Sequence, residues 1–448
     1  MNVQECMTHI RARMDSIIQS LFDAAETWPR EHWLAVGEQK VREATAQVGQ
    51  TVLQSLVDRH GTGHTGQYCQ GKNGETLKFK EYCPRRVITL VGHITIQRAS
   101  YRVECGEGAA LYPLDEELAL KGEYSEGVEE IVAFTGSQLT YTETSRLLEK
   151  SIGINVSEWK VQEVGETWGE EALEERARRL PTEVLSKRMA VGVDAAKVRT
   201  ALRRRKRKGS RKQHFEERWM DAKLAVAYGF DKRGEANSDK RYVASLQGRD
   251  AFAKRVWQMI ESTGADKAEQ VAWLGDGAEW VWSVKEEILP HAVEILDFFH
   301  ANDHLWTVAK AVWGENSKPG KRWVRAEKGR LLASRVDHVI EHLKQLSRQV
   351  GVPPKGCDSS DRRQVVASNV KYFEHNASRM DYKRYREQGY PIGSGVVESG
   401  CKHVIAQRMK ITAGMSWNAR QAEAILQLRC LVRSGQWDSF WSYKRMVA

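Results

Sequence analysis

The chain has 448 residues, of which 41% are apolar and 29% are charged, and its formal net charge is +10. No run of 18 apolar residues occurs, which excludes an apolar membrane span, and acids and arginines interrupt the apolar residues at the start, which argues against a secretory signal. Seven scattered cysteines fit reduced thiols better than a disulfide framework. We therefore expect a cytoplasmic protein of two to four domains that does not enter a membrane.

Residues 1–55 show a modest helical amphipathicity with no assigned role. Residues 56–118 change character, because RRVITL, VGH and ITIQRASYRV alternate β-branched and polar residues around a glycine, as a β-hairpin does. Three cysteines and two histidines accompany this hairpin, but no Cys-x-x-Cys pair is present, so a zinc site is disfavoured and zinc is not expected as a cofactor. The residues concerned are Cys69, Cys83, Cys105, His60 and His64.

Residues 119–187 are predicted to be helical and to include a helix-turn-helix-like DNA-binding region. A short helix is followed by a turn through Gly153 and by a second helix for which Ser157 is a suitable N-cap. In a helix-turn-helix the N-terminal end of the second helix enters the major groove. An ordinary helical hairpin at a domain junction fits the pattern equally well. The side chains expected nearest to the bases are Trp159, Lys160 and Gln162.

Residues 188–306 follow with three strand-like segments and then an alternation of strands and helices, which predicts a mixed sheet flanked by helices. The strand MAVGVDAAKV is predicted to end in Asp194, and the strand QVAWLG is followed by Asp276 in a Gly-Asp-Gly turn. Functional groups collect at the carboxyl ends of strands in such sheets. Two acids placed there repel each other unless a cation lies between them, and oxygen ligands of this kind suit Mg²⁺ or Mn²⁺.

Between these first two acids lies the run RRRKRKGSRK, which carries eight positive charges in ten residues. Such a run belongs in a solvated loop. One interpretation is a solubilising loop. The other is a clamp on nucleic acid, since cations that neutralise phosphates release condensed counterions, and the sequence pI of about 9.1 agrees with it. The cations expected to contact DNA are Arg203, Arg204, Arg205, Lys206, Arg207, Lys208, Arg211 and Lys212.

The stretch YPIGSGVVESGCKHVIAQRMK, residues 390–410, presents Glu398 at the start of a predicted helix. One interpretation is an acid in the first turn of the helix, which the helix dipole stabilises and which pairs with Lys402. The other is a third carboxylate that joins Asp194 and Asp276 to hold two divalent ions about 4 Å apart, as in-line phosphoryl displacement requires. In that case the cations expected to face phosphate are Lys402, Arg408 and Lys410.

Four blocks of the sequence resemble the ISKra family of bacterial insertion-sequence transposases: GVDAAKV, WLGDGAEWVW, ILDFFHANDHL and YPIGSGVVESGCKHVIAQRMKITAGMSW. The hairpin and the helix-turn-helix-like block resemble the N-terminal half of that family, although this chain has YCQGKN where members carry paired cysteines. The resemblance implies a ribonuclease H-like catalytic domain with metal-dependent cleavage and strand transfer at inverted-repeat ends. Its Asp-Asp-Glu triad corresponds to Asp194, Asp276 and Glu398.

The spacing of 122 positions from Asp276 to Glu398 leaves room for a helical insertion at residues 307–390, and residues 391–448 then close the catalytic domain. Related transposases carry an acid followed three positions later by a histidine before such an insertion. Asp297 and His300 match that pattern, and we expect them to support the fold rather than react.

The expected architecture is a multidomain α+β and α/β protein, with a ribonuclease H-like mixed sheet flanked by helices and interrupted by a helical insertion. A small β-hairpin module and a helix-turn-helix-like domain precede this sheet. The expected function is that of a transposase acting on double-stranded DNA, at terminal inverted repeats and at target sites, in association with the nucleoid. The expected assembly is a homodimer or a larger oligomer. Two alternatives remain open, which are a structure-selective nuclease without strand transfer and a non-enzymatic DNA-binding regulator.

Overall fold

The computed structural model describes residues 3–71, 74–103, 109–178, 184–204, 214–412 and 415–447. They form two compact units. The first unit comprises residues up to 135, residues 141–164 and the C-terminus from 444, and the second comprises residues 136–140 and 165–443. The six expected segments are thus gathered into two units, and the long helix α6 (Glu158–Arg178) runs from the first into the second.

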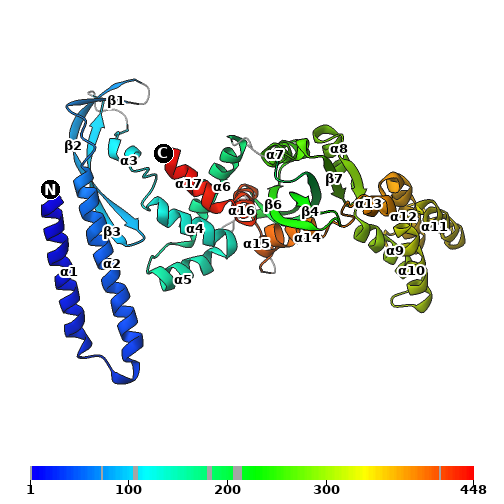
Figure 1. Cartoon of the computed structure of the whole chain (residues 1–448), viewed down its shortest axis with the longest axis horizontal. Helices are drawn as coiled ribbons and strands as arrows, with labels where there is room; N and C mark the ends of the chain where they lie inside the picture. Colours follow the sequence, from blue (N-terminus) through cyan, green and yellow to red (C-terminus); the bar gives the residue numbers. More distant parts are fainter. Residues whose placement is uncertain are drawn as a thin grey trace. The chain divides into compact units, whose positions relative to one another are not determined.

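The first unit contains the predicted β-hairpin, and this prediction is confirmed. Strands β2 and β3 pair antiparallel down to a tight turn closed by Thr89 and Gly92, and their buried residues pack on Leu114. A long helix, α2, lies along the hairpin, and α1 runs antiparallel beside α2 (Figure 1). The elements of this part are α1 (Val3–Ala25), α2 (Trp33–His60), β1 (Tyr68–Gln70), β2 (Thr76–Thr89), β3 (Gly92–Arg102), α3 (Pro113–Glu117), α4 (Glu126–Gln138) and α5 (Tyr141–Ile152).

The two helices and the short turn expected in this region are present as α5 and α6. Gly153 has a φ of 70°, a left-handed conformation that glycine adopts without strain, and it ends α5. The Ser157 hydroxyl accepts a hydrogen bond from the Lys160 amide at 3.3 Å, so it caps α6 as predicted. Cys69 and Cys83 lie on β1 and β2, whereas Cys105 lies outside the described residues.

The second unit is built on a five-stranded mixed sheet in the order β6-β5-β4-β7-β8. The first three strands in sequence pair antiparallel, and β7 and β8 then add in parallel to β4. The prediction of a mixed sheet flanked by helices is therefore confirmed. The strands are β4 (Arg188–Arg204), β5 (His214–Phe230), β6 (Ala236–Ser245), β7 (Gln270–Gly275) and β8 (Val293–Leu296).

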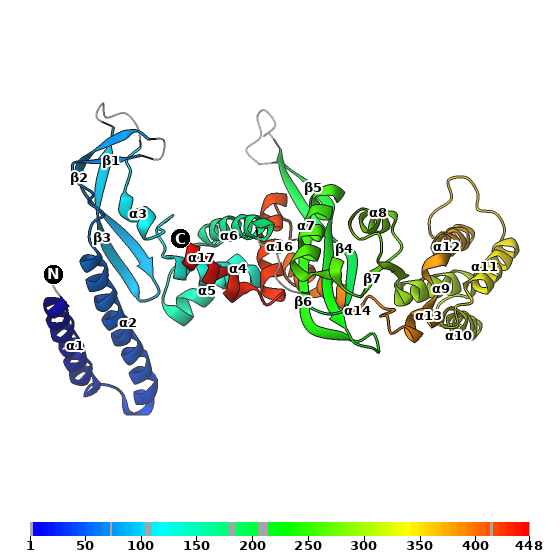
Figure 2. The ribbon, with the colours of Figure 1, turned by 45° about the horizontal axis from the view of Figure 1, so that its top comes forward.

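Helices cover both faces of this sheet. Helices α7 and α8 lie on one face, and α14, a π-helical turn and α16 lie on the other (Figures 1 and 2). The core between them is apolar, and Val191, Leu224 and Trp273 are fully buried in it. The bounds are α7 (Arg249–Thr263), α8 (Glu279–Ile288), α14 (Gly395–Gly400), the π-helical turn Cys401–Ala406, α15 (Gln407–Met409), α16 (Ala419–Arg433) and α17 (Trp437–Val447).

Five helices follow β8 and pack on one another beside that edge of the sheet (Figure 2). They occupy the expected insertion, although its first helix begins directly after the strand. They are α9 (Phe298–Trp313), α10 (Lys318–Leu332), α11 (Val336–Val350), α12 (Arg362–Asn376) and α13 (Tyr382–Glu387). None of the described helices combines the length and apolar composition that a bilayer span requires.

Candidate active site

Asp194 lies in the middle of a strand, not at its end. The predicted end of this strand was wrong, because β4 continues through Asp194 to Arg204 while paired with β5. The distal half of β4 also pairs with the segment around Trp417, through hydrogen bonds at Arg199 and Ala201. The parallel pairing of β4 with β7 nevertheless stops at Gly192. Asp194 is therefore two residues beyond the point where the two parallel strands separate.

Asp276 directly follows β7, as predicted, and its carboxylate accepts a hydrogen bond from the Ala278 amide at 2.9 Å. Gly277 has a φ of 98°, and a Cβ there would lie 2.9 Å from the Tyr372 ring. Both the backbone conformation and the crowding thus require glycine after the acid.

Asp194 and Asp276 are brought together where β4 and β7 separate. The pKa of Asp194 is raised, first because the residue is largely buried and also because the negative charge of Asp276 is close to it. The amide of Ala195 and the thiol of Cys401 donate hydrogen bonds to the Asp194 carboxylate, and His300 also favours its charged form. A carboxylate pushed toward protonation by burial and by a second acid is a group that a bound cation would stabilise.

Glu398 is held over the same region by close packing of α14 on the sheet. A Cβ at Gly192 would lie 3.0 Å from Val397, and one at Gly400 would lie 2.7 Å from Leu224. Small residues on both sides therefore let the helix approach β4 and β5. The Glu398 carboxylate is exposed and makes no ion pair or hydrogen bond within the described part of the chain. The alternative pairing with Lys402 is not formed.

The helix that carries Glu398 widens into a π-helical turn immediately afterwards. The buried guanidinium of Arg429, on α16, donates hydrogen bonds to the carbonyl oxygens of His403 and Val404 in this turn and to that of Ser137. Burial, with the charges of neighbouring arginines, lowers the pKa of Arg429 to about 10. π-Helical turns inside regular helices are frequent at functional sites. The first residue of this turn is Cys401, whose thiol reaches Asp194 at 3.6 Å.

Asp297 joins the insertion to the Glu398 helix. Its buried carboxylate caps α9 by accepting from the Phe299 amide at 2.9 Å. The same carboxylate accepts from the amide of Ser394 at 3.2 Å and from the Ser394 hydroxyl. Ser394 is the residue before α14. Asp297 therefore joins the start of α9 to the residue before α14.

The two histidines of α9 lie against Tyr372, a residue of the insertion that the sequence did not single out. The His304 ring stacks on Tyr372 with centroids 3.7 Å apart, and its Nδ1 lies 2.7 Å from the Asn369 side-chain oxygen. The Tyr372 hydroxyl donates to the backbone carbonyl oxygen of Asp276 at 2.9 Å. His300 lies beside His304, and its charge lowers the pKa of Asp194. No local pattern could have revealed Tyr372, because 96 residues separate it from Asp276.

The three cations of the closing helix have different environments. Lys402 and Lys410 are exposed, as expected of phosphate ligands. Arg408 is only 1% exposed, its guanidinium lies over the Trp417 ring at 4.6 Å, and it donates to the Gly136 carbonyl oxygen. The expectation that Arg408 faces DNA was wrong, because Arg408 lies on the buried side of its helix together with Met409.

The structure describes the environment of some, but not all, of the other residues expected to contact DNA. Lys160 is ion-paired with Glu163 at 3.1 Å, its side chain is 14% exposed and it lies near the Tyr124 ring. Gln162 is half-buried, whereas Trp159 is 68% exposed. The side chains of Arg203 and Arg204, at the end of β4, and the whole of residues 205–213 lie outside the described part of the chain.

The candidate site has the donor chemistry that a divalent cation requires, since three carboxylates lie on β4, after β7 and on α14. Two of them, Asp194 and Asp276, interact electrostatically, and the third carboxylate has no partner of its own. Among the described residues, however, no three His, Cys, Asp or Glu side chains lie close enough together to hold one ion. The residues therefore fit such an ion by chemistry, while their side chains do not form a closed cage.

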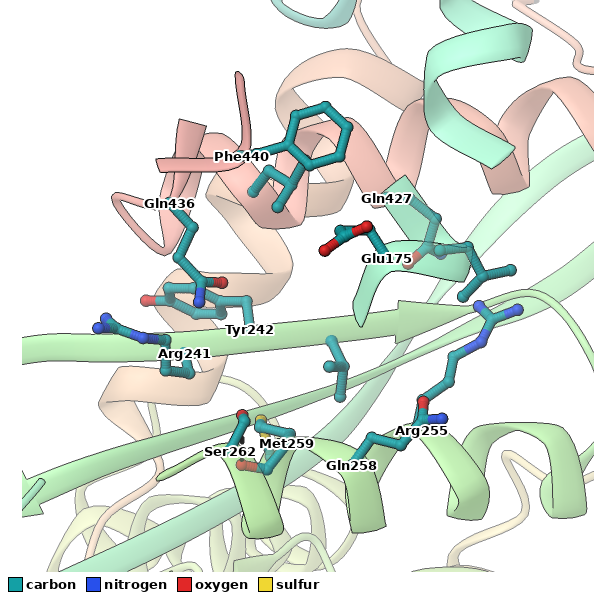
Figure 3. Close-up of a pocket in the computed structure, with 13 residues that line it drawn as sticks. Glu175, Arg241, Tyr242, Arg255, Gln258, Met259, Ser262, Gln427, Gln436 and Phe440 are labelled. Carbon is teal, nitrogen blue, oxygen red and sulfur yellow. Dashed lines mark hydrogen bonds between the residues drawn. The ribbon is translucent and has the colours of Figure 1, made fainter. Parts of the chain in front are cut away.

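A separate cavity of about 60 Å³ lies in the second unit among α6, β6, α7, α16 and α17. Glu175 and Arg255 are among the side chains that line it (Figure 3). Arg255 forms a buried ion pair with Glu423, which also accepts from the Leu246 amide. The cavity is large enough for a few water molecules but too small for a nucleotide, and it contains none of the three carboxylates.

Comparison of the chain with models of known protein families gives no match, and comparison with curated proteins gives none either.

Proposed function

We propose that this chain is a DNA transposase of the Asp-Asp-Glu type, which cleaves and joins DNA ends by metal-dependent phosphoryl transfer. The observation that carries the proposal is the meeting of Asp194 and Asp276 where two parallel strands separate, with the Glu398 helix packed on the same strand. Acids are costly in a half-buried position unless a cation compensates them. The presence of two acids at this position therefore favours a site that binds cations.

The sheet supports a ribonuclease H-like assignment. Numbered within the unit, its strand order is 3-2-1-4-5, with the second strand antiparallel to both neighbours and the last two parallel to the first. The first acid is on the central strand, the second follows the fourth strand, and the third begins a helix that packs on that central strand. This is the arrangement expected of the proposed fold.

The chemistry follows from these positions. Asp194, Asp276 and Glu398 would hold a pair of Mg²⁺ or Mn²⁺ ions in the proposed reaction class, and these ions would supply Lewis-acid stabilisation of the attacking and leaving oxygens. The protein's own groups position this site. Tyr372 holds the Asp276 turn from the insertion, while Asp297 and Ser394 hold the beginning of α14. Exposed Lys402 and Lys410 would contact the phosphates that flank the reacting one.

The proposed substrate is double-stranded DNA, both at the inverted repeats of the element and at the target. Two ends must be held at once for strand transfer, so we infer a homodimer or a larger assembly on DNA. Association with the nucleoid would follow from DNA binding. Helix α6, with Trp159 exposed near its N-terminus, remains the proposed recognition helix.

The test is cleavage of a plasmid that carries the sequences flanking the gene, with Mg²⁺ or Mn²⁺ and with EDTA as a blank. Wild type is compared with Asp276→Asn and with a matched control, Glu279→Gln, which neutralises an exposed acid three residues away. Cuts at defined ends, lost in EDTA and in Asp276→Asn but retained in the control, would support the transposase. The joining of those ends to a second plasmid would establish strand transfer.

Other outcomes of the same experiment would replace the proposal. Cuts at branched DNA that ignore the flanking ends but still need Asp276 would indicate a structure-selective nuclease. Binding to the ends without cleavage by any of the three proteins would indicate a DNA-binding regulator. Equal cleavage by wild type and Asp276→Asn would remove the candidate site from consideration.

A further inference from the structure

The first long helix of the insertion after α9 presents a continuous cationic face. Helix α10 carries six Lys and Arg residues and one acid in 15 residues. Five of the cations are exposed, and at 100° per residue they fall within an arc of about 120°. These residues are Lys318, Lys321, Arg322, Arg325 and Lys328. The buried residues Val324, Glu327 and Leu331 fall in a separate arc of about 60° outside this face.

The cations of this face lack the acidic partners that neutralise neighbouring cations. Within the described residues none of the five forms an ion pair. The single acid of the helix, Glu327, is buried and is occupied by Arg330 and His342. Eight of the other 13 cations in residues 307–390 are ion-paired, for example Lys344 with Glu374 at 2.8 Å on α11 and α12. A helix surface kept soluble by charge alone commonly intersperses both signs, and this one does not.

The local charge is large enough to matter at the scale of the whole protein. Residues 307–390 contain 18 Lys and Arg against 9 Asp and Glu, a net charge of +9, whereas the whole chain has +10. A concentrated positive face raises the local concentration of polyanions and accelerates their association. The face extends over about 15 Å, from Lys318 to Lys328, and a duplex of that length carries about nine phosphates.

The position of the face links it to the candidate site. The ammonium group of Lys328 lies 5.6 Å from the centroid of the Phe298 ring, and Phe298 follows Asp297 at the start of α9. The helix α9 also carries His300, whose charge acts on Asp194. The last turn of α10 is thus near the elements that hold the carboxylates, and the face leads outward from there.

We propose that this face, defined as Lys318, Lys321, Arg322, Arg325 and Lys328, binds the phosphate backbone of duplex DNA that extends beyond the candidate active site. The identification of the polyanion as DNA rests on the proposed function. The contacts are electrostatic and independent of base sequence, since they come from lysine and arginine side chains on an exposed helix. The face would therefore contribute to affinity and to placement of the DNA, not to recognition of an end sequence.

The experiment measures the salt dependence of binding without any cleavage. A fluorescein-labelled 30-base-pair duplex of arbitrary sequence is titrated with full-length protein in EDTA, between 50 and 200 mM NaCl, and binding is followed by anisotropy. The test variant carries Lys321→Gln, Arg322→Gln and Arg325→Gln. The control carries Lys344→Gln, Arg348→Gln and Lys383→Gln, which remove three ion-paired cations from the same insertion. Thermal melting checks that both variants remain folded.

Removal of three phosphate contacts is expected to reduce the slope of log K against log salt concentration by about 2.7, since each contact contributes about 0.9. Wild-type affinity should then fall about 40-fold more than that of the test variant across this salt range. The control should stay within about 0.5 of the wild-type slope. An unchanged slope in the test variant, or an equal change in both variants, would overturn the proposed surface.

This result is independent of the cleavage test. A reduced slope together with absent cleavage would retain the DNA-binding face while removing the transposase proposal. Specific cleavage together with an unchanged slope would retain the transposase proposal and remove the DNA-binding face.

Discussion

Asp297 offers a direct test of how the insertion and the Glu398 helix are held together. Its carboxylate accepts from the Phe299 amide, the Ser394 amide and the Ser394 hydroxyl, and it is only 6% exposed. The perturbation is a double-mutant cycle with Asp297→Ala, Ser394→Ala and the combined variant. Asp297→Asn serves as a conservative control, because asparagine is also a good N-cap.

The magnitudes follow from the bonds removed. Asp297→Ala loses the cap of α9, worth about 1 kcal/mol, and leaves the Ser394 amide and hydroxyl without their charged acceptor, which costs about 2 kcal/mol more. Ser394→Ala removes only the hydroxyl bond, for about 1.5 kcal/mol. If the two side chains act through each other, the combined variant should be destabilised by about 1.5 kcal/mol less than the sum of the single variants.

The assay is urea unfolding of the full chain, followed by tryptophan fluorescence, with the transition of the second unit analysed for each variant. Asp297→Asn should lose about 1 kcal/mol, since it keeps the cap but not the charge. Additive losses, within about 0.4 kcal/mol, would refute the reasoning because the carboxylate and Ser394 would then be independent.

Three further predictions concern the surroundings of the carboxylates. Tyr372→Phe should reduce cleavage about tenfold while the free energy of unfolding falls by about 1 kcal/mol, since one hydrogen bond to the Asp276 backbone is lost; unchanged single-turnover rates would contradict this. Arg429→Met should cost about 3 kcal/mol or more in urea unfolding, because several buried carbonyl oxygens lose their donor; a loss below about 1 kcal/mol would show that the π-helical turn does not depend on it. Burial lowers the pKa of His304, so the unfolded chain binds a proton at this histidine before the folded chain does as the pH falls below about 6.5. The contribution of His304 to the free energy of unfolding should therefore be fully present above that pH. It should be lost between that pH and the lowered pKa, by no more than about 1.4 kcal/mol per pH unit. His304→Gln should flatten that dependence in urea unfolding at pH 5–8, whereas His338→Gln, at an exposed site, should not.

The sequence alone determined the local features whose signals are short-range. The alternation around VGH predicted the β2–β3 hairpin. Gly153 and the capping residue Ser157 predicted the turn before α6, and the strand–helix alternation predicted a mixed sheet. These patterns depend on backbone preference and on the period of burial, so a few neighbouring residues suffice. The acidic triad and the metal ions remain proposals drawn from motif resemblance and residue chemistry.

Tertiary structure decided which of the candidate residues meet. It placed Asp194 in the middle of a long strand, because pairing with β5 and with the Trp417 segment extends β4 well past the acid. It buried Arg408, and it brought Tyr372 to Asp276 across 96 residues. Whether a cation faces solvent or a carbonyl, and which distant side chain supports a turn, depends on how helices dock on a sheet. No local pattern in the chain encodes that docking, so the sequence could suggest the acids but not the groups that hold them.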